Sequence, residues 1–432
     1  MVGSAPSNPS AALPAPSRIS PGMSYFYLSL LTMIYVISFI DRKLPFILIE
    51  SIKRDLSLSD TQIGLLTGVA FSLVFAIAGV PISRLAERYG RKATISSCLF
   101  AWSLLTAAGG LAQNFFHLLG ARMGVAIGEA GATPAAHSLL ADYFPKKRAM
   151  ALAVFSMGQP MGILIGLALG GLILDMAGWR TAMFVLGLPG IILAIVTFLA
   201  LKEPPRAPAG AEKAIGVIGT VRMLLRTSTF RHLAAAGMLF GCATGATATF
   251  SPAFLIRTYG QSATDVGLAY GLLVGIAGIS GAFISGYLTD RLRARDPRWG
   301  LWLVGTLLPF TVPFHILAWH APSYGWAVSF LAIPELSSVF WAAPTFLAVQ
   351  LLLPSTLRAV GSAAFLFFST GIGLSLGPFL AGLISDSLTG VVAGNSLGWS
   401  LTILTLLKLW AGLHFFIAAA RLRRDIHPEH VG

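Results

Sequence analysis

Long apolar stretches recur along almost the whole chain, separated by short segments that hold charged residues, prolines or glycines. A helix of roughly 20 apolar residues crosses the hydrocarbon core of a bilayer. In lipid, only a helix or a closed barrel satisfies every backbone polar group. The sequence therefore predicts twelve transmembrane helices, at residues 24–50, 59–86, 93–113, 115–142, 147–175, 180–201, 230–256, 262–290, 299–319, 323–352, 358–386 and 396–420.

The composition of the chain agrees with that prediction. Of its 432 residues 55% are hydrophobic and only 11% are charged, and the mean hydropathy is +0.77. A soluble domain carries about 25% charged residues, and a disordered chain has low hydrophobicity. Both classes are excluded, and an all-α membrane protein remains. Cys98 and Cys242 lie inside apolar stretches, so they form no secreted disulfide framework.

The net charge of +13 comes from basic residues that gather in alternate connections. If both termini are cytoplasmic, most of the 30 basic residues lie on the inner side, and the outer connections hold only Lys53, Arg54, Arg180 and Arg257. Cytoplasmic loops carry such an excess of Lys and Arg. We therefore expect a multi-pass membrane protein with cytoplasmic termini, and the charge requires no nucleic-acid partner.

Two groups of six helices are separated by the longest polar segment inside the chain. That segment is rich in proline and charge, which is typical of a linker. The expected organisation is a disordered cytoplasmic tail, an N-terminal bundle, a cytoplasmic linker, a C-terminal bundle and a second cytoplasmic tail, at residues 1–22, 23–201, 202–229, 230–421 and 422–432.

The two groups of helices resemble each other in sequence. Thr61-Gln62-Ile63-Gly64 matches Thr264-Asp265-Val266-Gly267, and the Gly162 to Asp175 segment matches Gly373 to Asp386 in its glycines and its final Asp. Because the repeats run in the same direction with six helices each, the halves are related by an axis along the membrane normal. This arrangement is typical of alternating-access transporters with a site at the midplane.

Residues 83–92, Ser-Arg-Leu-Ala-Glu-Arg-Tyr-Gly-Arg-Lys, resemble the signature Gly-x-x-x-Asp-Arg-x-Gly-Arg-Lys of the major facilitator superfamily. Ser83 and Glu87 depart from it, and a second copy keeps Gly286, Asp290 and Arg291. The resemblance implies the major facilitator fold, with twelve helices in two pseudo-symmetric halves, and secondary transport by alternating access.

A narrower resemblance involves Phe39-Ile40-Asp41-Arg42 and the segment from Arg122 to Ala130, which look like the spinster branch. That branch is associated with export of lysophospholipids and sphingolipids, so the resemblance implies an amphipathic lipid-like substrate. Anion–cation symporters of the same superfamily also carry an Arg-x6-Glu-x-Gly pattern like that of Arg122 to Gly131. A proton-coupled transporter of small organic anions or drugs is therefore the alternative.

Charged residues inside membrane helices are costly and mark functional sites. Asp41 and Arg42 lie in the first helix, and Arg122 and Glu129 in the fourth. Arg122 and Glu129 share a helix face but stand ~10.5 Å apart along it, so we expect pairing between the two helices, with Asp41 reaching toward Arg122 or Glu129. Two carboxylates near the midplane are difficult to ionise together.

We therefore predict that Asp41 and Glu129 are the proton-coupling pair, that Arg122 tunes them and that Arg42 contacts a substrate anion. A buried ion network that only fixes the two helices is the competing interpretation. Glu335, in the tenth helix, is a candidate substrate-binding residue or a packed polar group. Lys408, in the twelfth, is interpreted as snorkelling to the lipid surface, with substrate contact as the alternative.

Small residues and charges at helix ends add two mechanical predictions. Glycine ridges allow close helix contact in lipid, and the family fold implies that the fifth and eighth helices form the seam between the halves; simple tight packing is the alternative. Charged residues at the inner helix ends are predicted to form a cytoplasmic gate, or else to anchor loops to anionic head groups. The seam residues are Gly158, Gly162, Gly166, Gly267, Gly271 and Gly275, and the gate residues are Glu87, Arg88, Arg91, Asp142, Asp290 and Arg291.

The sequence contains no phosphate-binding loop, no nucleophile–base pair and no cluster of metal ligands. An enzyme is therefore not expected, and no catalytic residue, metal or other cofactor is assigned. A channel would need a continuous pore, which the paired halves with off-centre charges do not favour. The expected partners are membrane lipids, protons and a small-molecule or lipid substrate, bound by a monomer.

Overall fold

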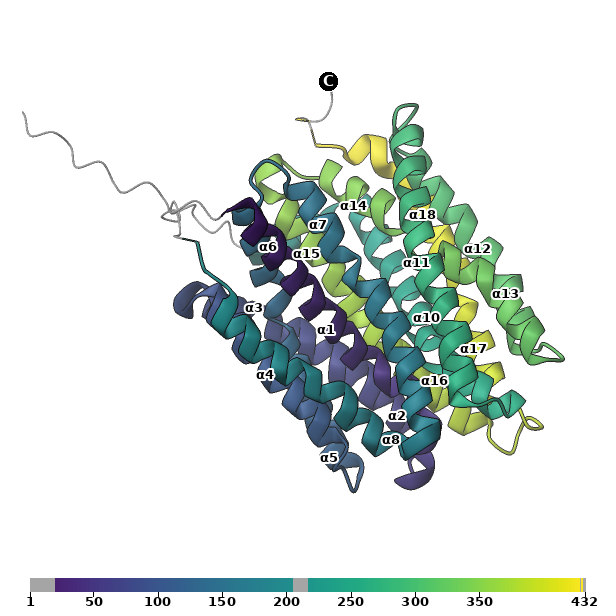
Figure 1. Ribbon diagram of the computed structural model, residues 1–432. Coiled ribbons are helices and arrows are strands. Elements are labelled where there is room, and N and C mark those ends of the chain that lie inside the picture. The colour runs from purple at the N-terminus through teal and green to yellow at the C-terminus, as the bar shows by residue number, and fades with distance from the viewer. Residues whose placement is uncertain (1–19, 205–216, 428, 430–432) are drawn as a thin grey trace, which may run out of the picture.

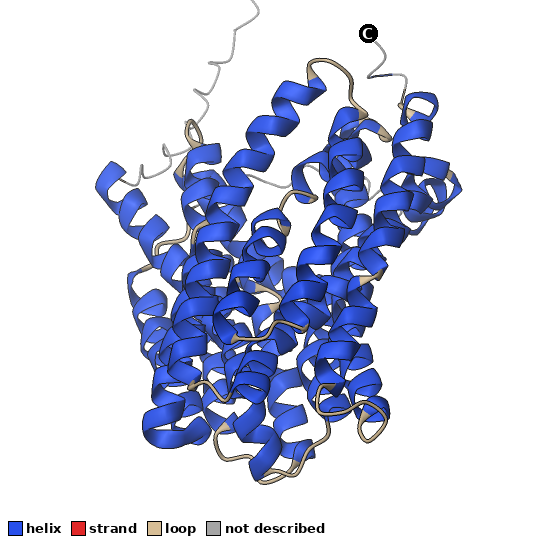
Figure 2. Cartoon of the chain, turned by 90° about the vertical axis from the view of Figure 1, so that its right-hand side faces the viewer, coloured by secondary structure: helices blue, strands red, loops and turns tan. Residues whose placement is uncertain are grey.

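The computed structural model describes residues 20–204, 217–427 and 429. Their helices form an upright bundle with connecting loops at its two ends, and the described part contains no β-strand (Figures 1 and 2). Residues 1–19 of the expected tail and 205–216 of the expected linker lie outside the described residues. The tail prediction is too long by two residues, because Ser20 caps a helix that begins at Pro21.

The first half of the bundle is built from helices joined by short turns. Its elements are α1 (Pro21–Asp55), α2 (Asp60–Gly64), the π-helical η1 (Leu65–Leu73), α3 (Val74–Tyr89), α4 (Arg91–Gly109), α5 (Phe115–Glu129), α6 (Ala132–Tyr143), α7 (Arg148–Ser156) and α8 (Gly158–Ala200).

The second half follows α9 (Val217–Arg226), a helix inside the expected linker. It comprises α10 (Ser228–Tyr259), α11 (Ala263–Arg293), α12 (Trp299–Trp319), α13 (Tyr324–Ser337), α14 (Ala342–Leu351), the 3-10 turn η2 (Ser355–Leu357), α15 (Arg358–Leu366), the π-helical η3 (Phe367–Leu374), α16 (Ser375–Leu388), α17 (Ser396–Thr405) and α18 (Leu407–Asp425). Because α18 continues to Asp425, it includes the first residues that the sequence assigned to the second tail.

Nine helical segments of the described chain are long and apolar enough to cross a membrane. One of them, Arg148–Ala200, breaks at Gly178, whose φ of 82° is left-handed, so it forms two crossings. The continuous helix α4 and the pair α5–α6 supply two more. The twelve crossings match the predicted ranges closely, since long apolar segments leave little freedom in where a helix runs.

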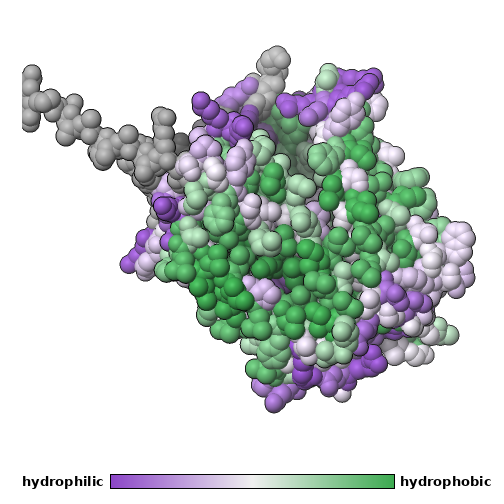
Figure 3. Space-filling model, viewed as in Figure 1, coloured by the Kyte–Doolittle hydropathy of each residue, from purple (hydrophilic) through white to green (hydrophobic). Residues whose placement is uncertain are grey.

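Both described chain ends lie at one end of the bundle, which we call the terminal face; the other end is the opposite face (Figure 1). On the face of the molecule seen in Figure 3, hydrophobic residues cover the middle and hydrophilic residues gather toward the two ends. This distribution is the one expected of a protein whose sides contact lipid.

The second and eleventh crossings are equivalent in the two halves, and both contain a π-helical segment. These crossings pack closely because glycines leave no side chain between them. A Cβ at Gly64 would overlap the backbone of Pro378, and one at Gly68 would overlap the carbonyl oxygen of Ser375. The halves therefore meet backbone to backbone along α2, η1 and α16.

Candidate functional site

Four charged residues of α1 and α5 lie together in the middle of the first half. Asp41, Arg122 and Glu129 are buried, and Arg42 is partly exposed. The guanidinium of Arg42 donates to the carboxylate of Glu129, which also accepts a hydrogen bond of 2.9 Å from the Ser38 hydroxyl. As expected from the spacing on α5, Glu129 pairs across to α1 and not with Arg122.

Arg122 approaches the main chain of α1. Its Nη1 donates to the carbonyl oxygen of Asp41 at 3.2 Å, and its guanidinium carbon lies 4.7 Å from the centroid of the Phe71 ring. The same ring lies 5.4 Å from the guanidinium carbon of Arg42. The aromatic face thus contacts both cations. The Asp41 side chain, which was expected to reach toward Arg122 or Glu129, forms no recorded hydrogen bond or ion pair with either, and its backbone carbonyl accepts from Arg122 instead.

The carboxylate of Asp41 has no hydrogen-bond partner among the described residues, and its residue is fully buried. The indole of Trp102 and the hydroxyl of Thr106 lie beside it, but neither donor meets hydrogen-bond geometry with it or with any other acceptor. Asp41 is therefore a buried carboxylate that none of the ion pairs recorded among the described residues holds.

A second polar group lies in the other half. The hydroxyl of Tyr270 donates to Oε1 of Glu335 at 2.9 Å. Lys408 is only 3% exposed, and its Nζ lies 3.4 Å from Nε2 of His315. The interpretation of Lys408 as a lipid-facing, snorkelling residue is therefore wrong: its side chain points into the bundle, where the ring of Phe240 lies 6.0 Å away.

At the terminal face, Arg91 is the centre of the predicted gate residues. It donates to Asp142 at 2.5 Å and to Ser138 at 2.9 Å. Glu203, which the sequence did not single out, accepts from the Arg91 backbone N–H at 2.9 Å. Partial burial raises the pKa of Glu203, but hydrogen bonds from the backbone of Arg91 and Lys92 and from the Arg91 side chain outweigh it and lower that pKa.

All recorded contacts of the other gate residues also stay within one half. Arg88 lies over the ring of Tyr89, and Arg291 donates to the Tyr287 hydroxyl at 2.9 Å. The side chain of Glu87 lies outside the described residues, and Asp290 is exposed. Among the described ion pairs, none joins the halves at the terminal face.

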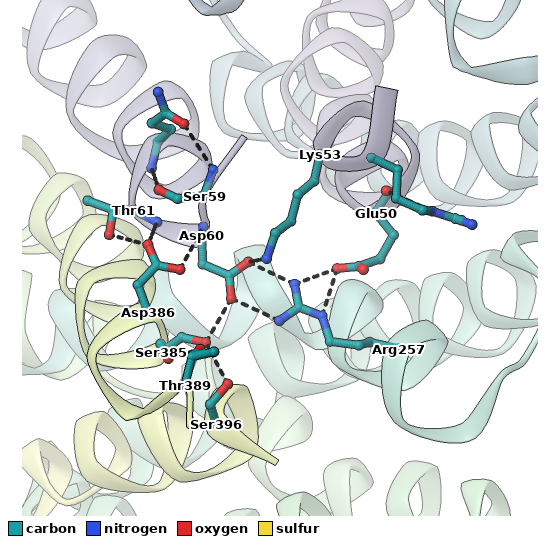
Figure 4. Close-up of polar contacts among 12 residues, drawn as sticks. Glu50, Lys53, Ser59, Asp60, Thr61, Arg257, Ser385, Asp386, Thr389 and Ser396 are labelled. Atoms are coloured by element: carbon teal, nitrogen blue, oxygen red, sulfur yellow. Dashed lines mark hydrogen bonds and ion pairs between the residues drawn. The ribbon is translucent and has the colours of Figure 1, made fainter. Parts of the chain in front are cut away.

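The opposite face is where ion pairs connect the halves (Figure 4). Arg257, at the end of α10, donates to Glu50 at 2.7 Å and to both carboxylate oxygens of Asp60 at 2.7 and 2.8 Å. Asp60 also binds Lys53 at 2.5 Å and accepts from the Ser385 hydroxyl at 2.7 Å. We call these residues the Arg257 network.

Two further contacts at this face are equivalent in the two halves. Asp386 accepts from the backbone N–H groups of Asp60 and Thr61 at 3.1 and 2.8 Å (Figure 4). Asp175 accepts from those of Ala263 and Thr264 at 3.3 and 2.7 Å. Each carboxylate caps the start of a helix in the other half, where free N–H groups favour an anion. We call them the paired caps.

The sequence repeat already aligned Thr61 with Thr264 and Asp175 with Asp386. It did not show that Asp386 meets Thr61 and that Asp175 meets Thr264. That pairing follows only once the halves are placed face to face.

The glycine seam is partly different from the prediction. Substitution at Gly158, Gly162 or Gly166 would place a Cβ against Thr32, Val36 or Ile40 of α1. These three glycines therefore face a helix of their own half, and their assignment to the seam is wrong. The glycines of α11 do face α8: the Cβ of Gly267 would overlap the Leu167 carbonyl, and Gly271 and Gly275 lie against Leu164.

Comparison with known proteins gives the family context. Residues 31–378 match the model of the Major Facilitator Superfamily. An MFS-type efflux pump of Mycolicibacterium smegmatis is 39% identical, over 95% of this chain and 96% of that protein. Human protein spinster homolog 1 is 28% identical, over 95% of this chain and 84% of its own length.

A solved structure is similar over nearly the whole chain. It is a bacterial homologue of the human lysosomal transporter spinster in an inward-facing, unoccupied conformation, with a TM-score of 0.86 and 27% identity, covering 95% of this chain and 99% of that one. These matches confirm the predicted fold class and the resemblance to the spinster branch. They also confirm that the protein is a transporter and not an enzyme.

Proposed function

The chain belongs to the Major Facilitator Superfamily as a secondary transporter of the spinster type, and we propose that it couples proton movement to transport of an amphipathic, lipid-like substrate. Its membrane is the inner membrane of a bacterium, with both termini in the cytoplasm. Residues 23–201 and 230–421 are the two bundles that rock against each other, joined by the linker 202–229.

The distribution of contacts supports an inward-facing state. Ion pairs between the halves gather at the opposite face, in the Arg257 network, and the paired caps lie at the same end. With cytoplasmic termini, as the basic residues favour, the opposite face is external. The external side is then closed, as in the inward-facing spinster homologue. Transport requires these contacts to open while Arg91, Asp142 and their neighbours close the cytoplasmic side.

Asp41 carries the proposal of proton coupling. Its carboxylate is buried and unpaired, whereas Glu129 is already bound by Arg42 and Ser38. Negative charges on Asp41 and Glu129 repel each other, so proton binding at Asp41 and rearrangement of the Arg42–Glu129 pair are linked. Arg122 tunes both carboxylates, since it interacts electrostatically with each.

The test is transport by the purified protein in liposomes with an imposed pH gradient. Asp41→Asn and Glu129→Gln are expected to abolish the stimulation of flux by the gradient. Asp265→Asn, which changes an exposed carboxylate away from the site, is the control and should keep it. Full gradient-dependent flux in both Asp41→Asn and Glu129→Gln would refute the coupling role.

The lipid-like substrate rests on similarity to the spinster branch. Small organic anions or drugs remain the second candidate, since Arg42 and Arg122 are suited to bind carboxylates. A thermal-shift screen of lysolipids, sphingoid bases and small organic acids separates the two. Stabilisation by the small acids alone would favour the second candidate.

A further inference from the structure

Glu335, on α13, belongs to no ion pair recorded among the described residues. Its carboxylate interacts electrostatically with Lys408 of α18 and with Lys43 of α1. The recorded hydrogen-bond partner of Glu335 is the hydroxyl of Tyr270, and Nζ of Lys43 lies 4.4 Å from the centroid of the Phe46 ring.

Lys408 donates to His315 and has further N–H groups for which no acceptor is recorded among the described residues. Nδ1 of His315 lies 3.2 Å from the carbonyl oxygen of Thr311, and a carbonyl only accepts, so Nδ1 carries the proton. Nε2 then faces Lys408 with its lone pair, at 3.4 Å. The described residues offer the ammonium no other hydrogen-bond acceptor, although it has three N–H groups.

More donors without acceptors lie near Lys408. The hydroxyl of Thr405, one turn before Lys408, and the indole N–H of Trp319, one turn after His315, are buried and unpaired. The rings of His315 and Trp319 are 6.0 Å apart. Buried polar groups are nearly always paired in native proteins, so a cluster of buried donors without acceptors indicates a place for an anion.

The formal charges of the ionisable side chains in the middle of the bundle also indicate a place for an anion. The described groups that interact electrostatically here are four basic and three acidic side chains: Arg42, Lys43, Arg122, Lys408, Asp41, Glu129 and Glu335. Arg42 and Glu129 form a closed pair. Basic side chains therefore outnumber acidic ones by one in this group, and a buried charge that is not neutralised is costly unless it serves a function.

We propose that Lys408, with the unpaired donors of Thr405 and Trp319 beside it, forms a binding site for the anionic group of the transported molecule, a carboxylate or phosphate, and that Glu335 is the internal counter-charge of this site in the empty protein. The inference deepens the proposed function, on which it rests. An incoming anion accepts from the free N–H groups of Lys408, and Glu335 keeps its hydrogen bond from Tyr270.

The experiment measures ligand binding by calorimetry to the protein in lipid nanodiscs. The probes are octyl phosphate, glucuronate and, as the uncharged reference, octanol. Lys408→Met is expected to weaken binding of the anionic probe roughly 10-fold or more, as for loss of a charge-assisted hydrogen bond. Lys408→Arg should retain most of the affinity, and Lys146→Met, at an exposed lysine, is the matched control.

Glu335→Gln is the decisive variant, because it keeps the shape of the side chain and its contact with Tyr270 but removes the internal counter-charge. It is expected to tighten binding of the anionic probe several-fold and to leave octanol binding unchanged. Its effect should disappear in the Lys408→Met background. The probe that binds, octyl phosphate or glucuronate, identifies a lipid-like or a small anion as the source of the charge.

Three results would overturn the site: weaker anion binding in Glu335→Gln, unchanged binding in Lys408→Met, or no preference of the unmodified protein for either anion over octanol. If one of these results is found and transport still depends on the pH gradient, the anion site is refuted and proton coupling is not. Conversely, loss of proton coupling with the predicted binding changes would refute the proposed function and not the site.

Discussion

Asp175 and Asp386 hold equivalent positions near the ends of two helices, and each accepts hydrogen bonds from the first turn of a helix in the opposite half. The two contacts follow the internal repeat of the sequence. They close the same face of the molecule as the Arg257 network, so we expect the opening of this face to depend on all of them.

Removing the charge of either cap is expected to favour the open external face. An anion at a helix start contributes about 0.3–1 kcal/mol, so Asp175→Asn and Asp386→Asn should each raise the open population up to about fivefold. Spin labels at Leu111→Cys and Val391→Cys, which are 66% and 75% exposed on this face, report the separation. An unchanged distance distribution in both variants would contradict the prediction.

Arg257→Gln is expected to have a larger effect than Lys53→Gln. The first leaves Glu50 and the buried Asp60 without their bridging cation, whereas the second leaves Arg257 in place. Breaking a buried pair costs about 3–5 kcal/mol; because Arg257 is partly exposed, we expect roughly 2 kcal/mol, seen as a lower melting temperature and a wider distance between the same spin labels. Equal effects of the two substitutions would argue against a central role of Arg257.

Glu203 makes the stability of the terminal face depend on pH in the acidic range. Its pKa in the folded protein is below the ordinary value of 4.5, so its contribution is fully present above that value and is lost as the pH falls through the lower, folded-state pKa. Glu203→Gln should lower the melting temperature at pH 7 and reduce the further loss between about pH 5 and pH 3. An identical acid dependence in both proteins would exclude this role.

Two glycine substitutions should distinguish close contacts between the halves, at the seam, from packing inside one half. The Cβ of Gly267→Ala would overlap Leu167 across the halves, so we expect the external face to open. The Cβ of Gly162→Ala would overlap Val36 and Phe39 in the same half, so we expect lower stability without opening. Gly286→Ala, which meets open space, is the control. Opening caused by Gly162→Ala would contradict this distinction.

The membrane helices and the symmetry of the two halves are predictable because they depend on features within each segment. Apolar length places the helices, and the matches of Thr61 with Thr264 and of Asp175 with Asp386 indicate the repeat. Pairing between α1 and α5 was also foreseeable, since Arg122 is too far along α5 to reach Glu129, but the partner of Glu129 on α1 is Arg42 and not the predicted Asp41. The roles of these residues in transport stay predictions.

Contacts between segments were less predictable. The glycine spacing in α8 defines a helix face but not the neighbour that covers it, so α1 was missed. The sequence around a lysine in an apolar helix does not show whether its side chain points to lipid or into the bundle. Only the placement of α12 beside α18 reveals His315 next to Lys408. Glu203 was missed because two of its donors are the backbone N–H groups of Arg91 and Lys92, which leave no trace in the side-chain pattern, and its side-chain partner Arg91 lies far away in the sequence.

Each of the paired caps accepts from two backbone N–H groups, which every amino acid except proline supplies, and from one threonine hydroxyl, that of Thr61 or Thr264. Replacement of Thr264 or of Thr61 therefore leaves the backbone hydrogen bonds of the paired caps in place. Only substitution of Asp175 or Asp386, or a proline at the helix start, removes these bonds. During evolution the threonines at these helix starts can therefore change while the backbone hydrogen bonds of the paired caps persist. Few single substitutions are therefore expected to remove the paired caps.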